Sequence, residues 1–281
     1  MNTATKLINR ASLEIEPVSS ISYLEAEILL CFVKKISREE LYLNPDIILS
    51  DTQEENFNTV VTNRAKGMPL AYITGKKEFY GRDFVVNDSV LIPRPETEMI
   101  IDETRAAVKK IPVSLIIDIG TGSGCIGITL ALELTNIDVI ACDIDLKALE
   151  TARTNAKDYG VDNRITYVKS DLLKEIDKKA DIVVVNLPYV LETDKENLDE
   201  KHAVSLKYEP HNALYAGIDG LDLYKRLVVE LKGKLPKLLI LEIDPRQAIA
   251  LSKTINESLC PKSLQIKKDL AGHDRLIIAS F

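Results

Sequence analysis

Short apolar runs alternate with stretches of helical periodicity from residue 114 to the end of the chain. The apolar runs predict strands at residues 114–119, 138–142, 164–168, 180–185, 237–242, 264–268 and 275–279. The periodic stretches predict helices at residues 125–134, 145–159, 221–231 and 245–259, with a long loop at residues 190–219. This alternation predicts an α/β fold whose mostly parallel sheet is covered on both faces. Only residues 269–274 separate the last two strands, too few for a crossover helix, so we expect them to pair antiparallel.

The first 75 residues have a different pattern, which predicts helices throughout. Residues 21–36 are rich in Leu, Ile, Val and Ala at helical spacing. Ser37 with Glu40, and Thr52 with Glu55, fit the capping-box pattern that begins a helix. We therefore expect helices near residues 37–43 and 53–66, and Gly67-Met68-Pro69 ends this part of the chain.

The segment between these two parts predicts a hairpin followed by a stiff extended stretch. Two alternating runs, residues 77–80 and 83–86, are separated by Gly81-Arg82. In residues 91–98, prolines on both sides of Arg94 restrict the backbone to an extended path. This stretch is either an interdomain linker or a support that places Arg94 or Glu96 at a pocket. We expect a helical domain at residues 1–75, a hairpin and linker at 76–96, and the α/β domain at 97–281.

Composition narrows the class of protein. Hydrophobic residues make up 46% and charged residues 28% of the chain, values typical of a soluble globular protein. The net charge of −7 argues against tight binding to naked nucleic acid, which depends on neutralising phosphates. We expect neither a membrane span nor a signal peptide, because no apolar run is long enough. The four cysteines form no CxxC pair, which favours free thiols in the reducing cytoplasm. The three histidines, His202, His211 and His273, lack metal-ligand spacing, so we expect no metal.

A glycine-rich turn follows the strand at residues 114–119 and opens the next helix. It reads Asp118-Ile119-Gly120-Thr121-Gly122-Ser123-Gly124, and such a turn lets the backbone approach a ligand. Asp143 ends the next strand, where a carboxylate can accept both hydroxyl protons of a ribose, while Asp145 fits better as the helix cap. These features indicate a nucleotide-like cofactor. They do not identify it, because Gly122, Gly124 and Gly127 also satisfy the GxGxxG pattern of dinucleotide sites.

Asp171 and Leu172 follow the third strand of the predicted sheet. In that position Asp171 could reach the amine of an adenine base, or it could only cap the next turn. The sequence leaves both roles open.

The apolar strand that ends at Val185 is followed by Asn186-Leu187-Pro188-Tyr189. Ligands in open α/β sheets bind beyond the carboxyl ends of the strands, which is where Asn186 is expected. An asparagine offers neutral acceptors and donors and cannot titrate, so it suits a planar NH2-bearing group. The Asn186 oxygen and the Leu187 carbonyl could each accept one N–H of an amide, with Tyr189 against its plane. The alternative is a strand that simply ends at a proline turn.

The chain resembles the bacterial release factor glutamine methyltransferases, the HemK/PrmC family, over nearly its whole length. The most specific match is Leu91-Ile92-Pro93-Arg94-Pro95-Glu96-Thr97-Glu98, which corresponds to the family's LIPRPETE segment. Glu209-Pro210, Ala213-Leu214, Gly217 and Asp219-Gly220-Leu221 match its EP..AL..G.DGL signature. Two positions depart from the pattern: Leu187 replaces the first proline of NPPY, and Asp244 replaces the glycine of EIG.

The resemblance implies a seven-stranded Rossmann-like class I methyltransferase domain joined by a β-hairpin to a small helical domain that helps to grip the substrate. It implies methyl transfer from S-adenosylmethionine to the glutamine N5 in the Gly-Gly-Gln loop of peptide chain release factors. The residues that it implies at the cofactor are Arg94, Gly120, Thr121, Gly122, Ser123, Gly124, Asp143, Asp171, Leu172 and Asn186. Those at the substrate amide are Asn186, Leu187, Pro188 and Tyr189.

Three alternatives remain open at this point: a glutamine methyltransferase of a ribosomal protein, an N6-adenine nucleic-acid methyltransferase with a similar Asn-x-Pro-aromatic loop, and a non-catalytic binding module. We expect a cytoplasmic monomer with no direct nucleic-acid partner and no membrane partner.

Overall fold

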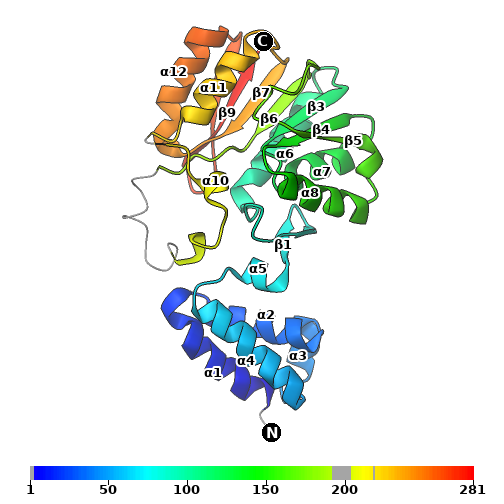
Figure 1. The fold of residues 1–281 in the computed structure, drawn as a ribbon, viewed down its shortest axis with the longest axis vertical. Helices are drawn as coiled ribbons and strands as arrows, with labels where there is room; N and C mark the ends of the chain where they lie inside the picture. Colours follow the sequence, from blue (N-terminus) through cyan, green and yellow to red (C-terminus); the bar gives the residue numbers. More distant parts are fainter. Residues whose placement is uncertain (1–2, 192–203, 218) are drawn as a thin grey trace. The chain divides into compact units, whose positions relative to one another are not determined.

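The computed structural model describes residues 3–191, 204–217 and 219–281, and Figure 1 shows the course of the chain. The described residues group into two compact units. One contains residues 3–76 together with residues 204–208, and the other contains residues 77–191 and 209–281 except residue 218. Of the three histidines named above, His202 lies outside the described residues.

The first unit is helical, as its sequence pattern predicts. Its α-helices are α1 (Ala4–Ile15), α2 (Ser22–Lys34), α3 (Arg38–Leu43), α4 (Asp51–Ala65) and α5 (Leu70–Thr74). They pack around a core that includes Leu7, Leu29, Leu30 and Phe57, which are almost completely buried. Burying one apolar face of each helix is what stabilises helices of this length.

One of the two predicted capping boxes of this unit is confirmed, and the other is wrong by two positions. Ser37 and Glu40 form the box that begins α3. Helix α4 begins instead with Ser50 and Gln53. The cap must have an extended backbone, and Ser50 has one (φ −67°, ψ 162°), whereas Thr52 already lies inside the first helical turn.

The predicted hairpin is present with its turn one residue earlier than expected. Strands β1 (Lys76–Phe79) and β2 (Arg82–Val85) are joined by Tyr80 and Gly81. Both turn residues have positive φ, 54° and 72°, as two-residue turns that match the twist of a hairpin require. This register buries Phe79 and Phe84 together, with ring centroids 6.1 Å apart.

The second unit is a seven-stranded sheet covered by helices. Its strands are β3 (Leu115–Ile119), β4 (Asp138–Asp143), β5 (Ile165–Lys169), β6 (Ile182–Val185), β7 (Leu238–Glu242), β8 (Ser263–Lys268) and β9 (Asp274–Ser280). Its longer helices are α6 (Glu98–Val108), α7 (Cys125–Glu133), α8 (Leu146–Asp158), α11 (Asp222–Leu231) and α12 (Ala248–Leu259). The strand order is β5-β4-β3-β6-β7-β9-β8, and the predicted antiparallel pairing of the last two strands is confirmed.

Two local expectations change in this unit. The segment expected to be a loop at residues 190–219 contains a short helix, α10 (His211–Leu214), and residues 192–203 and 218 lie outside the described residues. The helix expected at residues 245–259 begins with a separate 3-10 turn, Pro245–Gln247.

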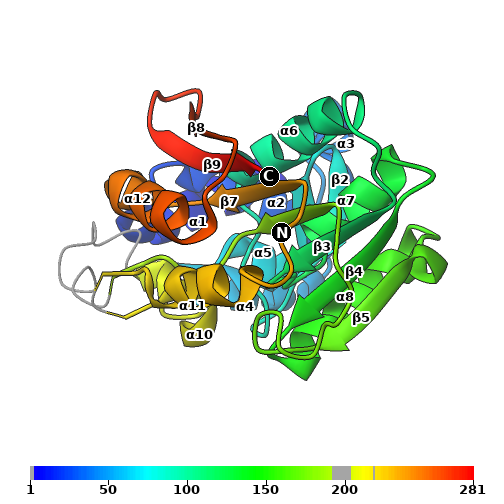
Figure 2. The same cartoon turned by 90° about the horizontal axis from the view of Figure 1, so that it is seen from above.

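Alternation along the central strands explains the two layers of helices. Ile117, Val183 and Leu239 face one side and pack with α11 and α12. Their neighbours Ile116 and Val184 face the other side and pack with α6 and α7, so the sheet lies between two helical layers (Figures 1 and 2). Strands buried on both faces are what the continuous apolar runs of the sequence predict.

Candidate active site

The carboxyl ends of four adjacent strands bring together residues that are far apart in the sequence. Ile119 of β3 is in register with Cys142 of β4 and Val185 of β6, and Val185 is in register with Leu241 of β7. The residues that immediately follow these four positions therefore lie in one row at the end of the sheet. They are Asp143, Gly120, Asn186 and Glu242. The strand order reverses at β3, and ligands of open α/β sheets bind at such a switch point.

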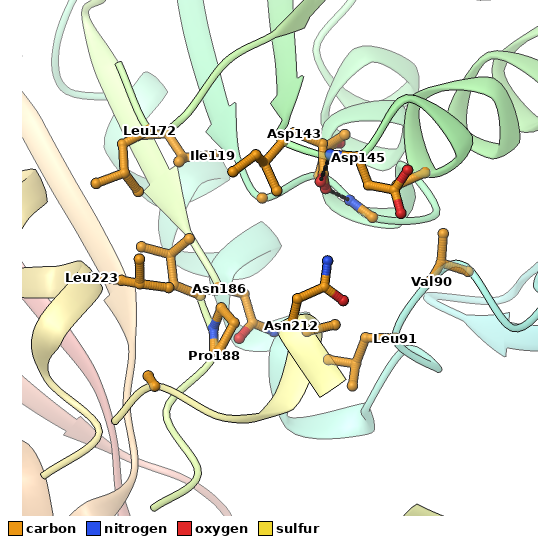
Figure 3. Close-up of a pocket in the computed structure, with 18 of the residues that line it drawn as sticks. Val90, Leu91, Ile119, Asp143, Asp145, Leu172, Asn186, Pro188, Asn212 and Leu223 are labelled. Carbon is orange, nitrogen blue, oxygen red and sulfur yellow. Dashed lines mark hydrogen bonds between the residues drawn. The ribbon is translucent and has the colours of Figure 1, made fainter. Parts of the chain in front are cut away.

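A cavity of about 460 Å³ opens beyond this row, within the size range of small-molecule sites. Figure 3 shows Asp143 and Asp145 on one side of the cavity and Asn186, Pro188 and Asn212 across from them. The predicted site residues that line the cavity are Arg94, Gly120, Thr121, Gly122, Ser123, Asp143, Asp171, Leu172, Asn186, Leu187 and Pro188. Gly124 and Tyr189 are not among the lining residues, so their predicted ligand contacts stay predictions.

The glycine-rich turn is held against the end of β4 by backbone hydrogen bonds. The N–H groups of Gly120 and Thr121 donate to the Cys142 carbonyl at 2.9 and 3.0 Å. Gly122 has a positive φ of 54°, and a Cβ there would enter open space, so the turn leaves room for a ligand. A Cβ on Gly124 would lie 2.7 Å from the Ile128 side chain. A glycine is therefore needed here to let the turn pack closely against the helix.

Asp143 is fixed by the same turn. Its two carboxylate oxygens accept hydrogen bonds from the N–H groups of Gly122 and Asp145, each at 3.0 Å (Figure 3). Burial raises the pKa of Asp143, and these two N–H donors oppose the rise. Each carboxylate oxygen can accept a further hydrogen bond, so the aspartate can still bind a diol. The side chain of Asp145 caps α8, as predicted, by accepting from the N–H of Lys147.

Asp171 lines the cavity but already has two cationic partners. Lys174 Nζ and Arg226 Nη2 lie 2.6 and 2.5 Å from its Oδ2, and hydrogen bonds from Lys174 and then Arg226 lower its pKa. The following turn is capped by Ser170, whose hydroxyl accepts from the N–H of Glu175. Capping is therefore not the role of the Asp171 side chain in this turn.

Arg94 has the extended backbone predicted for a residue between two prolines (φ −100°, ψ 143°). Its Nη2 lies 2.6 Å from Oε1 of Glu209, whose other oxygen accepts from the N–H of Ile92 at 3.1 Å. The Glu209 side chain is 2% exposed. This buried carboxylate thus holds Arg94 at the wall of the cavity, which supports the second of the two predicted roles.

Asn186 is oriented by a residue that sequence reasoning did not select. Its Nδ2 donates to the hydroxyl oxygen of Thr97 at 3.2 Å, and Thr97 also lines the cavity. The amide oxygen of Asn186 is then the acceptor that remains for a ligand. The only sequence signal for Thr97 was its place in the LIPRPETE segment.

Leu187 packs its side chain into the core and leaves its carbonyl at the loop. It is 6% exposed and belongs to the core on the α11 side of the sheet. The hydroxyl of Tyr224, on α11, lies 3.3 Å from the Leu187 carbonyl and 2.5 Å from the Glu242 carbonyl. Tyr224 is completely buried, and nothing in the sequence pattern distinguished it from an ordinary core residue.

Tyr189 is anchored by β7 and by the turn after it. Its hydroxyl donates to Glu242 Oε1 at 3.2 Å, and its carbonyl accepts from Gln247 Nε2 at 2.9 Å. Asp244, the second departure from the family pattern, caps the 3-10 turn that carries Gln247. Capping of this turn therefore accounts for an aspartate at this position.

The described residues contain no cluster of three or more His, Cys, Asp or Glu side chains with the geometry of a metal site. Within the same residues, no helix combines the length and the apolar character needed to cross a bilayer.

Comparison with known proteins identifies the family. The family model of the PrmC N-terminal domain matches residues 6–75, and that of the methyltransferase small domain matches residues 99–203. The release factor glutamine methyltransferase of Bacillus cereus is 38% identical over 264 residues, which cover 90% of this chain and 90% of that protein. The protein of the same name from Nitratidesulfovibrio vulgaris is 36% identical over 261 residues, covering 91% and 87%.

A solved structure shares the fold of most of the chain. The N-terminal domain of human METTL16 in complex with SAH has a TM-score of 0.51 and 19% identity, covering 80% of this chain and 84% of that one. The family models and relatives show that the chain is a methyltransferase. At 38% and 36% identity over nine-tenths of its residues, the chain belongs to the release factor glutamine methyltransferase family.

Proposed function

We propose that the protein transfers the methyl group of S-adenosylmethionine to the N5 amide nitrogen of the glutamine in the Gly-Gly-Gln loop of a peptide chain release factor. The proposal is supported by the names of its relatives and by one structural observation: the residues facing the cavity at the end of β6 are neutral acceptors. The reaction forms a C–N bond, breaks the S–C bond and releases one amide proton to solvent.

The cavity suits this cofactor. Asp143 is a half-buried acceptor at the end of β4, as a ribose requires, and Gly122 leaves open space beside it. Ser123 also lines the cavity, and its buried hydroxyl has no partner of good hydrogen-bond geometry among the described residues. We propose that Arg94, Thr121, Asp171 and Leu172 complete the cofactor site with Gly120 and Asn186.

When bound, S-adenosylmethionine supplies a methyl group on a sulfonium, which is electrophilic without further activation. The protein's task is then to present the nitrogen of a carboxamide, whose lone pair is delocalised and weakly nucleophilic. The Asn186 oxygen and the Leu187 carbonyl can each accept one N–H of that amide. This orients the nitrogen and stabilises the positive charge that develops on it during transfer. Neither group has to remove a proton before the methyl group moves.

The helical unit, residues 1–75, is proposed to contribute to the grip on the release factor. Deleting it should raise the KM for the protein substrate. The affinity of the sheet domain for the cofactor should stay within about twofold of that of the full-length protein. A deletion that changes neither value would contradict this role. We also propose that the protein acts as a cytoplasmic monomer, which light scattering of the purified chain and fractionation of its source cells would test.

The experiment that tests the function offers tritiated S-adenosylmethionine with purified release factor, the same factor with its Gly-Gly-Gln glutamine replaced by asparagine, ribosomes, and DNA. We expect label on the intact release factor alone. Label on DNA or on a ribosomal protein would show that the substrate is not a release factor. Label that persists after the glutamine is replaced would show that another side chain is methylated. Asn186→Ala should lower kcat far more than it lowers cofactor affinity.

A further inference from the structure

The two ends of the Asn186 amide have opposite chemistry, so its orientation decides whether the site can work. A substrate carboxamide presents two N–H donors, which need an acceptor oxygen opposite them. If the Asn186 amide were turned over, its own NH2 group would face those donors. The residues that fix this orientation therefore matter as much as Asn186 itself.

Thr97 alone cannot fix the orientation. Its hydroxyl lies 3.2 Å from Asn186 Nδ2, and the residue is 1% exposed. A hydroxyl has one hydrogen and two lone pairs, so it could accept from Nδ2 or donate to the amide oxygen. Which of these occurs depends on where the hydroxyl hydrogen of Thr97 is directed.

A carboxylate beside Asn186, that of Glu242, is the candidate acceptor for that hydrogen. It is 1% exposed and follows Leu241, the β7 partner of Val185, so it lies beside Asn186 in the row of strand ends. Its Oε1 accepts from the Tyr189 hydroxyl, and its Oε2 is buried without a hydrogen-bond partner in the described part of the chain. Burial raises the pKa of Glu242, and the nearby Thr97 hydroxyl is the largest of the effects that lower it. The buried, unpartnered Oε2 is thus an acceptor that the hydrogen of Thr97 can turn to.

An ionised carboxylate only accepts hydrogen bonds, so it draws the single hydrogen of Thr97 toward itself. The Thr97 oxygen is then left as an acceptor, and the only group of Asn186 that it can bind is the NH2. The amide oxygen of Asn186 consequently faces the cavity.

We propose that Glu242 and Thr97 are positioning residues that set the polarity of the Asn186 amide, so that its oxygen is presented to the substrate. Glu242 holds the same loop at two further points. Its carboxylate binds the Tyr189 hydroxyl, and its carbonyl binds Tyr224, which lies next to the Leu187 carbonyl. The proposal rests on the proposed function, because it assigns these residues a part in presenting an amide.

Burial raises the pKa of Glu242, and three neighbouring groups oppose that rise. Arg275 lowers the pKa of Glu242 through its charge, and the Tyr189 hydroxyl lowers it by hydrogen bonding. Glu96 raises it, as burial does. Arg275 is itself held in place by Asp269, 2.9 Å away. A cation near a buried carboxylate reduces the free energy needed to keep it charged.

The test is a set of threonine variants of the full-length protein. Thr97→Val keeps the shape of the side chain and removes the hydroxyl, whereas Thr97→Ser keeps the hydroxyl. Thr129→Val is the matched control, because Thr129 is also fully buried and its hydroxyl has no hydrogen-bond partner among the described residues. Glu242→Gln adds a side chain that can donate as well as accept.

We expect Thr97→Val to lower kcat at least tenfold, with the KM for release factor and the Kd for S-adenosylmethionine changed less than about twofold. Thr97→Ser should recover kcat to within about threefold of wild type, and Thr129→Val should leave it unchanged. Glu242→Gln should lower kcat as Thr97→Val does. A Thr97→Val enzyme with wild-type kcat, or with losses in Kd that match the loss in kcat, would overturn the proposal.

A second measurement keeps this test separate from the substrate assignment. The side-chain amide protons of Asn186, identified by their absence in Asn186→Asp, should be protected from exchange in wild type and in Thr97→Ser and exposed in Thr97→Val. Unchanged protection in Thr97→Val would refute the positioning role whatever the substrate is. A wild-type protein that shows this protection and labels no release factor would overturn the proposed function alone.

Discussion

The hydroxyl of Tyr224 lies 3.3 Å from the carbonyl oxygen of Leu187, the atom proposed to accept one N–H of the substrate amide. The same hydroxyl is 2.5 Å from the carbonyl of Glu242, so its one hydrogen is directed mainly there. A side chain from α11 thus connects the loop after β6 with the end of β7, and it fills the space behind the loop.

Removing that hydroxyl should loosen the loop without changing its shape. We expect Tyr224→Phe to lower kcat about threefold to tenfold, because a net hydrogen bond contributes about 1 kcal/mol, and to leave cofactor affinity unchanged. Tyr159→Phe is the control, since its hydroxyl also donates to a backbone carbonyl, that of Asp83, away from the cavity. Equal kcat values for the two variants would show that the hydroxyl does not support the site.

Leu187→Pro restores the proline that the family pattern has at this position. The substitution restricts the backbone of Asn186, so we expect kcat to be preserved or raised. It also removes an apolar side chain that is 6% exposed, so the free energy of unfolding should fall by about 1–3 kcal/mol. Leu187→Ala separates the two effects, because it loses the packing without gaining the restriction. A large loss of kcat in Leu187→Pro alone would mean that the loop follows another path.

Two glycines with nearly equal positive φ provide a matched pair. At Gly220 (φ 67°) an added Cβ would lie 2.2 Å from Gln247 Nε2 and 2.4 Å from the Tyr189 carbonyl, whereas at Gly160 (φ 68°) it would meet nothing within 4 Å. We expect Gly160→Ala to lower stability by about 1 kcal/mol through backbone strain and to leave kcat unchanged. Gly220→Ala should lower stability further and reduce kcat, because it separates Gln247 from Tyr189. Thermal unfolding measures the stability of each variant, and initial rates measure its kcat. If the two variants gave the same values, the anchoring of Tyr189 by Gln247 would not support the site.

The raised pKa of Asp118 predicts how the free energy of unfolding depends on pH. Burial raises its pKa from 3.8 to about 6, against hydrogen bonds from Thr121 and from the N–H of Gly127. The folded state therefore keeps the proton to higher pH than the unfolded state does. This tighter proton binding contributes its full stabilisation below about pH 4. The contribution is lost as the pH rises through about 6, a change on the order of 3 kcal/mol in the free energy of unfolding.

Asp118→Asn cannot ionise and should not show this loss. We expect the free energy of unfolding of the variant, relative to wild type, to increase between pH 4 and pH 7, as measured by urea unfolding at each pH. Parallel curves for the two proteins would mean that Asp118 has the same pKa in both states.

Much of the architecture could be predicted because it follows from local patterns. The continuous apolar runs ending at Ile119 and Val185 required strands buried on both faces, and the six residues before Arg275 were too few to return by a helix. The strand-end positions of Asp143, Gly120 and Asn186 then placed them in one row, because parallel strands share their carboxyl edge. The positions of the Thr52 cap and of the hairpin turn were wrong by one or two residues, because several neighbouring residues satisfied the same local rule.

The sequence by itself determined which elements form and which side chains stand at the ends of the strands, because periodicity, glycine and proline act over a few residues. Only the tertiary structure decided what those side chains touch. Thr97 reaches Asn186 across 89 positions of the chain, and Glu242 reaches Tyr189 across 53. Such pairings depend on the order of the strands and on which helix covers which face of the sheet. Neither can be predicted from the local pattern of polar and apolar residues.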